Sequence, residues 1–385
     1  MAGLLNIGVS ALLAYQRSLT TTGHNIANAN TDGYNRQRVE MATRPPQQLG
    51  DSWLGSGVSV TQVTRQYDQF LATSMRSSIS ASSEMDAYYT HAARLDTLLG
   101  DSDTGLDSAI QNFFAAINTI ADDPTSIAAR QAFLLEADSL VNRFHDLNSQ
   151  INESRRQLNN ELASDITEIN SIASNIADLN NQIMTASGQP NDLLDERDQQ
   201  LNKLSELVSV STVQQSDGAI SVFIGSGQSL VTGITASTLS VEIVDDSSNH
   251  DIVYTNQSGA SQTITSLVTG GEVGGLLNYR SDILNESQNM LGLAALGITD
   301  ELNTQHQLGM DLDGNLGGLM FTSPATSQGV VLQDSAATGT VTFAFDDITD
   351  LTSSDYELVY NAASTNYTLT RLSDGTTTTL AAGST

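Results

Sequence analysis

One long helical pattern restricts the folds open to this chain more than any other feature. The pattern covers residues 126–187, starts after Asp122–Thr125 and ends at Gly188–Pro190. In its second half, aliphatic residues recur every three or four positions, at Leu158, Leu162, Ile166, Ile169, Ala173, Ile176 and Ile183. Such a helix spans roughly 90 Å and is unstable as a single strand. We expect its stripe to pack inside the same chain, with residues 274–308 as the partner.

A second apolar seam lies at the N-terminus. Leu5, Leu12, Leu19 and Ile26 are seven residues apart, a spacing typical of one face of a coiled helix, and they predict a helix over residues 4–28. No local segment is expected to cover this helix, because a turn-forming run at residues 28–34 and a connector with Pro45 and Pro46 follow it. We therefore expect the seam to pack against another subunit, and its residues are candidates for an assembly interface.

The rest of the chain alternates between helical and strand patterns. Helices are expected over residues 67–99, 106–121, 191–207 and 274–308. Strands are expected at 58–63, in a hairpin over 208–224 turning at Asp217–Gly218, and at 238–244, 251–255, 262–267, 341–345, 356–360 and 367–371. This order predicts an α+β multidomain fold, in which a long antiparallel coiled helical body carries inserted β domains and an N-terminal amphipathic polymerisation helix.

Four parts are expected along the chain. They are an N-terminal axial helix with its connector (1–65), a helical body (66–207 with 272–325), a small β-rich region (208–271) and the start of an outer β domain (326–385).

Charge and composition exclude several classes of protein. The formal net charge of −29 argues against a nucleic-acid partner, which requires clustered Lys and Arg. The first 50 residues depart from this trend, with four Arg against two carboxylates. The acidic charge of the chain is interpreted as a surface that keeps it soluble, and the alternative is that the N-terminal segment sits in a different environment from the rest. There is no Cys, no run of 18 apolar residues and no recognisable cleaved signal, so we expect no disulfide and no membrane span.

No motif predicts catalysis. The five His residues are scattered and are interpreted as structural: His24, His91, His145, His250 and His306. Asp311–Asn315 resembles a calcium loop faintly, but its Gly is misplaced and Thr322 stands where the closing Glu belongs, so a plain turn is expected. Gly225-Ser226-Gly227 lacks the third Gly and the helix of a dinucleotide fingerprint. We predict no catalytic, cofactor-binding or metal-binding residues, and no enzyme.

The N-terminal residues resemble the signature of bacterial flagellar rod, hook and hook-associated axial proteins. The matching positions are Gly8, Val9, Ser10, Ala11, Leu12, Ala14, Gln16, Leu19, Asn25, Ile26, Ala27, Asn28, Asn30, Thr31, Gly33, Tyr34 and Arg36. Three later stretches narrow the resemblance to the FlgK family of hook–filament junction proteins. They lie at 57–71, at 190–198 and at 274–321, and the resemblance covers residues 1 to about 325.

This resemblance implies a structural role in the bacterial flagellum. It implies an extracellular adaptor between hook and filament, secreted by flagellar type III export with the help of an export chaperone. Its partners would be further copies of itself in a ring, the hook protein and a second junction protein. The implied assembly residues are Leu5, Leu12, Leu19, Ile26, Asn28, Asn30, Gly33, Tyr34 and Arg36.

One departure from the family pattern concerns the C-terminus. Family members end in a C-terminal heptad helix, whereas this chain ends at Thr385 in a strand-like region, so it is interpreted as truncated. The alternative to the junction role is an extracellular adhesion module that binds through its β domains. An enzyme is a third hypothesis, which the sequence supports least.

Overall fold

The computed structural model describes residues 2–100, 105–243, 249–322, 327–328, 342–343, 348–361 and 365–381. Its contacts divide the chain into two compact units. The first contains Met1–Ala87, Leu162–Glu242 and Asp251–Gly275, and the second contains Tyr88–Glu161, Ile243–His250 and Leu276–Thr385. The division falls inside two long helices, α2 (Gln69–Leu99) and α4 (Ile127–Thr185). The α+β composition expected from the sequence is confirmed.

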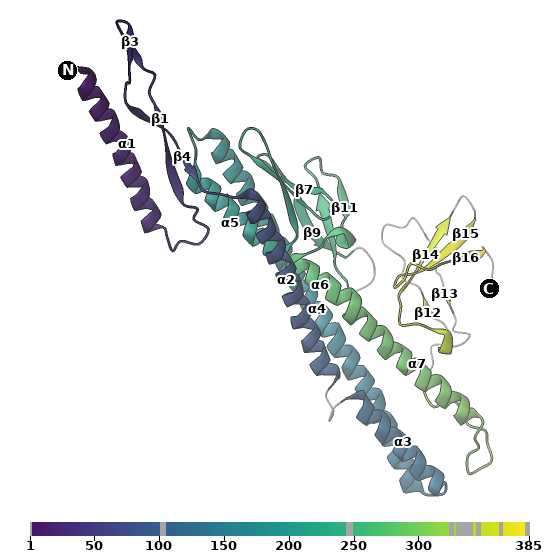
Figure 1. Cartoon of the computed structure of the whole chain (residues 1–385). Coiled ribbons are helices and arrows are strands. Elements are labelled where there is room, and N and C mark those ends of the chain that lie inside the picture. Colours follow the sequence, from purple (N-terminus) through teal and green to yellow (C-terminus); the bar gives the residue numbers. More distant parts are fainter. Residues whose placement is uncertain are drawn as a thin grey trace. The chain divides into compact units, whose positions relative to one another are not determined.

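The first unit begins with a helix and a β ribbon. Helix α1 (Ala2–Ala27) is followed by β1 (Gln37–Thr43), which pairs antiparallel with β4 (Val58–Arg65). A bulge between Glu40 and Met41 shifts the register of this ribbon. The short strands β2 (Gln47–Leu49) and β3 (Ser52–Leu54) pair at the tip of the same ribbon (Figure 1). The predicted helix over residues 4–28 and the predicted strand at 58–63 are confirmed.

Two small sheets follow helix α5 (Asn191–Leu207). Strands β5 (Val210–Gln214), β6 (Ile220–Ile224), β7 (Gln228–Thr232) and β8 (Thr235–Ala236) form an antiparallel meander. Strands β9 (Thr238–Glu242), β10 (Asp251–Thr255) and β11 (Ser261–Thr263) form a second sheet. The predicted hairpin at Asp217–Gly218 is confirmed. The strand predicted over 262–267 is partly wrong, because a 3₁₀ turn occupies Thr265–Leu267.

Two asparagines of α4 fasten these sheets to the helix. Asn180 is fully buried, and its amide donates to the carbonyls of Ile220 at 2.9 Å and Gly233 at 2.6 Å. Asn170 donates to the carbonyl of Leu239 at 2.7 Å and accepts from the same residue's N–H at 2.8 Å. Because a buried amide left unpaired is costly, these bonds fix which strand edges face the helix.

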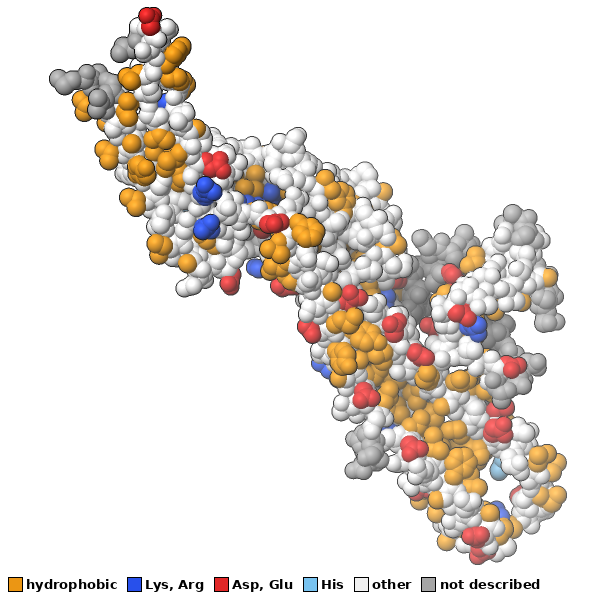
Figure 2. All heavy atoms as spheres, viewed as in Figure 1, with side chains coloured by type: hydrophobic (Ala, Val, Ile, Leu, Met, Phe, Trp, Pro, Cys, Tyr) orange, Lys and Arg blue, Asp and Glu red, His pale blue; other side chains and the backbone are white. Residues whose placement is uncertain are grey.

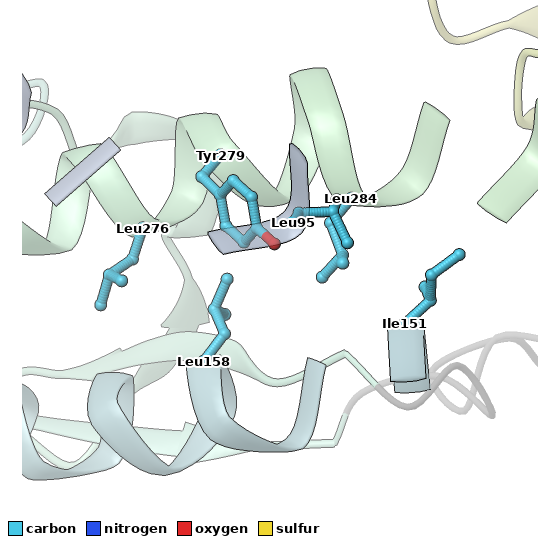
Figure 3. Packing of buried hydrophobic residues seen from close by; sticks show 6 residues of the cluster. All are labelled: Leu95, Ile151, Leu158, Leu276, Tyr279 and Leu284. Carbon is cyan, nitrogen blue, oxygen red and sulfur yellow. The ribbon is translucent and has the colours of Figure 1, made fainter. Parts of the chain in front are cut away.

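The second unit contains the core in which the predicted partner meets the long helix (Figure 3). Its fully buried members come from α2, from α4 and from residues 276–284, and they are Leu95, Ile151, Leu158, Leu276, Tyr279 and Leu284. Helix α6 (Gly271–Tyr279) runs into a π-helical turn at Arg280–Asn285 and then into α7 (Glu286–Gln307). The expected packing of residues 274–308 on the long helix is confirmed for its part before Leu162, where Leu158 is the one stripe residue in this cluster. The rest of the stripe, from Leu162 to Ile183, belongs to the first unit, so that part of the expectation is wrong. The single predicted helix also contains the π turn.

A second core in this unit surrounds Phe113 of α3 (Leu106–Asp122). Ala137 and Leu140 of α4 are buried with it, and Phe321 packs against it. The β part beyond contains a pair, β12 (Ser327–Gln328) with β13 (Thr342–Phe343), a 3₁₀ turn at Ile348–Asp350, and a three-stranded sheet of β14 (Tyr356–Asn361), β15 (Asn366–Arg371) and β16 (Thr377–Ala381). The strands predicted at 356–360 and 367–371 are confirmed. The one predicted at 341–345 falls mostly outside the described residues.

Candidate assembly surface

Helix α1 exposes its heptad seam to solvent. Leu5, Leu12, Leu19 and Ile26 are 69%, 71%, 73% and 73% exposed. Figure 2 shows hydrophobic side chains gathered over this helix, and Val9, Leu13 and Tyr15 are exposed beside the seam. Full burial of an aliphatic side chain is favourable by about 1.5–3 kcal/mol, so four such residues with about 70% of their surface still exposed offer about 4–8 kcal/mol to a partner that covers them.

The opposite face of α1 is small and already covered. Ser10 and Ala14 are buried against the ribbon of β1 and β4. The Ser10 hydroxyl donates to the carbonyl of Ile7 at 2.8 Å and accepts from the N–H of Val58 at 3.3 Å. A Cβ on Gly57 would stand 2.2 Å from that hydroxyl, so the ribbon approaches the helix closely. The expectation that no local segment covers this helix is therefore wrong, yet the covered face is not the seam.

Asn25 fastens the end of α1 to the start of β1. Its side-chain amide donates to the carbonyl of Gln37 at 2.9 Å, and its side-chain oxygen accepts from the Gln37 N–H at 2.8 Å. The same oxygen accepts from the Tyr34 hydroxyl at 2.7 Å. Burial raises the pKa of Tyr34, with smaller contributions from Asp192 and Asp195. The sequence predicted Tyr34 as an interface residue but not Asn25. The Asn25 side chain both donates to and accepts from the backbone of Gln37, and no sequence pattern near Asn25 indicates this.

The remaining candidates lie around the connector. The Asn28 side chain donates to the carbonyl of His24 at 3.1 Å, which closes the helix end. Gly33 has φ +74°, a conformation that favours glycine, and a Cβ there would stand 2.3 Å from the Gln199 side chain and displace it. Asn30 and Arg36 have exposed side chains, while the carbonyl of Arg36 accepts from the N–H of Gln66 at 2.8 Å. The structure thus brings Asn28, Gly33 and Tyr34 into one turn.

Beyond the turn, the chain is tied to helix α5 by a buried polar network, which we call the connector junction. Its members are Asn35, Arg65, Tyr67, Asn191, Asp195 and Asp198. Asn35 donates through its backbone N–H at 3.0 Å and its side-chain amide at 2.8 Å to the two oxygens of Asp195. Arg65 donates to Asp195 at 3.0 Å and also bonds Asp198, and the side chains of these three residues are only 11%, 6% and 13% exposed.

Two further contacts complete the connector junction. The guanidinium of Arg65 lies 4.2 Å from the centre of the Tyr67 ring, a cation–π geometry. Asn191 donates to the carbonyl of Val63 in β4 at 2.8 Å. The two sequence stretches at 57–71 and 190–198 therefore meet in space, although roughly 130 residues separate them in the chain. Removing one partner of such a buried pair costs far more than the pair contributes net, so the junction fixes the connector.

The motifs that the sequence analysis weighed for metal or nucleotide binding lie outside this surface and form ordinary turns in the described residues. Among the described residues, no three His, Asp or Glu side chains are grouped as metal ligands are. The Asp311 carboxylate accepts from the N–H groups of Asp313 at 2.9 Å and Asn315 at 2.8 Å, as in a plain turn, and the hydrogen bonds from Asn315 lower its pKa. Gly225 and Gly227 lie in the turn between β6 and β7, so a strand does follow that motif. Within the described residues, no helix has the length and apolar content to cross a membrane.

Comparison with known protein families gives a class first. Residues 5–35, which hold α1 and its turn, match the sequence model described as flagella basal body rod protein. The N-terminal segment is thus of the kind found in flagellar axial proteins.

Residues 92–321 match the model described as the flagellar hook-associated protein FlgK helical domain, which is more than half of the chain. The chain belongs to the FlgK family.

Individual relatives agree with this assignment. Flagellar hook-associated protein 1 of Salmonella typhimurium is 33% identical over 384 residues, which cover 98% of this chain and 69% of the relative. The Escherichia coli K12 protein of the same name is 32% identical over 390 residues, which cover 99% and 70%. The structure of the flagellar hook junction protein FlgK from Burkholderia pseudomallei superposes with a TM-score of 0.75 at 34% identity, over 81% of this chain and 57% of that one.

Proposed function

We propose that this chain is a structural adaptor of the bacterial flagellum that joins hook to filament through its N-terminal helix. Family membership supports the structural role and favours it over the adhesion alternative, because the relatives are named as flagellar hook-associated proteins. It equally argues against an enzyme. The observation that carries the proposal is a helix with one face closed by its own ribbon and four large aliphatic side chains exposed on another face.

The assembly interface we propose contains Leu5, Leu12, Leu19 and Ile26 as the apolar contact. Asn28, Asn30, Gly33, Tyr34 and Arg36 would hold the turn that orients it. Neighbouring subunits would cover the seam, because an exposed apolar stripe of this kind marks an interaction site. Assembly with hook components in the external flagellum follows from the family.

Finer parts of the function are also proposals. We propose a ring of copies, contact with a second junction protein, an export chaperone and secretion by flagellar type III export. We also propose that the four parts expected from the sequence, at 1–65, 66–207 with 272–325, 208–271 and 326–385, serve as axial segment, helical body and two β parts.

The test replaces seam residues in the chromosomal gene. The variant Leu12→Asp with Leu19→Asp should abolish filament attachment and swimming, because each Asp would have to be buried as a charge at the interface. The matched control is Asn6→Asp with Thr20→Asp, which adds the same charge at two exposed polar positions of the same helix.

Secretion and folding are measured alongside motility. Both variants should accumulate in the culture medium and show the helical content of the wild type by circular dichroism. Normal swimming of the seam variant, or equal loss in the control, would contradict the proposed interface.

A further inference from the structure

A pocket lies beside the connector junction in the first unit. It has a volume of about 510 Å³ and is lined by the start of α2, the end of α4, the segment 188–190, the first half of α5, and the hairpin of β5 and β6. Its charged lining residues are Arg65, Arg76, Arg197, Asp198 and Asp217. This volume falls within the range of roughly 300–1,000 Å³ typical of sites for small organic ligands.

Two of the pocket's arginines are buried, and each has one guanidinium nitrogen without a hydrogen-bond partner. Arg76 is 5% exposed, its Nη1 has no hydrogen-bond partner, and its Nη2 only approaches the Thr73 hydroxyl at 3.4 Å. Arg197 is 3% exposed and donates through Nη1 to the side-chain oxygen of Asn180 at 3.0 Å and to the carbonyl of Gly218 at 2.8 Å. Its Nε has no partner. The negative charge of Asp198 acts on Arg197, whereas no ion pair of Arg76 is found among the described residues.

The pocket's own carboxylates are already engaged. Asp198 binds Arg65 and accepts from the Tyr67 hydroxyl, and Asp217 accepts from the N–H of Ala219 at 3.1 Å. Arginine stays charged in proteins, so it does not escape burial by losing a proton. A buried guanidinium nitrogen without a partner, on a residue that lines a cavity, therefore favours an acceptor group bound in that cavity.

We propose that this pocket binds a carboxylate group, held by Arg76 with Arg197 beside it. The planar guanidinium offers paired N–H donors that match the two oxygens of a carboxylate. Arg65 is already balanced by Asp195 and Asp198, which leaves the unpartnered guanidinium nitrogen of Arg76 as the group to which a carboxylate would bind. Ile183, Pro190 and Leu194 supply apolar lining for the hydrocarbon part of the acid.

Two sources carry this chemistry. The first is an Asp or Glu side chain of a second copy of the chain, which holds 44 such residues against 15 Lys and Arg. That source rests on the proposed function, because it requires copies to meet. The second source is a dissolved organic acid, which requires no assembly at all.

The first experiment measures binding by thermal unfolding of the purified chain, with sodium acetate replacing sodium chloride at constant ionic strength. Acetate well above its dissociation constant should raise the melting temperature of the wild type by about 3 °C. Arg76→Met should abolish this shift, and without acetate it should melt no lower than the wild type, because the variant removes an unpaired buried charge. The matched control Arg156→Met, at an exposed arginine paired with Glu153, should keep the shift.

The absence of an acetate-specific shift in the wild type, or an equal shift in Arg76→Met, would overturn the proposal. A second measurement needs no variant. Crystals of the wild type soaked with 4-iodobenzoate should show anomalous iodine density in the pocket, with the carboxylate against Arg76. Binding elsewhere only, or none, would equally overturn the proposal.

Sedimentation velocity separates the two sources. If the chain associates with rising concentration, the carboxylate belongs to a second copy when both acetate and Arg76→Met weaken this association and Arg156→Met does not. A monomer at all concentrations, together with acetate binding, assigns it to a dissolved acid. Because the acetate arm does not depend on the seam, loss of the proposed flagellar role and loss of the carboxylate site give different results.

Discussion

Replacing Arg65 by Met tests whether the connector junction holds the N-terminal segment in place. Arg65 donates to Asp195 and Asp198, and all three side chains are at most 13% exposed. The change leaves two carboxylates buried close together without their cation. Removing one partner of a buried pair costs about 3–5 kcal/mol. Asn35 keeps its two hydrogen bonds to Asp195, so we expect the lower end of this range.

Hydrogen exchange read by mass spectrometry measures this loss locally. Peptides from residues 58–68 and 191–200 cover the connector junction, and a loss of about 3 kcal/mol corresponds to exchange faster by on the order of 100-fold, since 1.36 kcal/mol is a factor of ten. Peptides from the second unit should keep their rates, because their buried clusters contain none of these residues.

The control for this experiment is Arg156→Met. That arginine pairs with Glu153 at the surface, where the two side chains are 65% and 52% exposed, so its exchange should change less than about twofold. Adding Asp198→Asn to Arg65→Met should recover part of the protection, because one of the two unpaired charges disappears. Exchange in Arg65→Met no faster than in the control would refute the role given to the buried pair.

Two further predictions concern the turn at the end of α1 and a buried histidine. Gly33→Ala should destabilise the connector by about 1–3 kcal/mol through its positive φ, and the added Cβ should also displace the Gln199 side chain. Gly50→Ala is the control, because Gly50 has φ +67° with open space around it, and this change should cost less. Equal hydrogen-exchange rates near both sites would contradict the steric argument. Burial lowers the pKa of His91, against the opposing effect of Glu161, so the unfolded chain takes up this proton more readily. The contribution of neutral His91 to stability is complete above about pH 6.5 and is lost as the pH falls towards the pKa of the folded state. Melting temperatures measured from pH 5 to 8 should therefore depend less steeply on pH in His91→Gln than in the wild type. An unchanged slope would count against this account.

Sequence periodicity predicted the helices because their apolar stripes are long and regular. The stripe through Leu158 to Ile183 predicted helix α4 to within two residues at each end, 126–187 against Ile127–Thr185. The same reasoning did not detect the π turn at Arg280–Asn285, since one extra residue shifts the later apolar positions by one place, and a spacing that already varies between three and four residues hides a single shift. Strand β1 was missed for another reason. Its sequence, from Gln37 to Thr43, is mostly exposed and polar, so no alternation marks it.

The candidate site was predicted in part. The spacing of the seam residues predicts their shared face, and the structure shows these side chains exposed, as the proposed interface requires. The connector junction was not predicted. Arg65 and Asp195 lie within the stretches at 57–71 and 190–198 that resemble the family, but a contact between residues 130 positions apart has no signature in a single sequence. The covered face of α1 was missed because Ser10 and Ala14 are too small to form an apolar stripe.

The seam of α1 repeats along the helix, so it does not by itself fix how far a neighbouring helix is shifted along the axis. Its aliphatic groups recur every seven residues, or about 10.5 Å along the helix axis, so a neighbouring helix that slid by one such step would meet nearly the same groups. Apolar contact alone thus leaves several sliding positions close in energy. The turn at Asn25 and Tyr34, clamped to β1, gives the helix one end that is unlike every other point along it. In a packed bundle of these helices, that end would set the axial register between neighbours, whereas the leucines would contribute binding energy in every register.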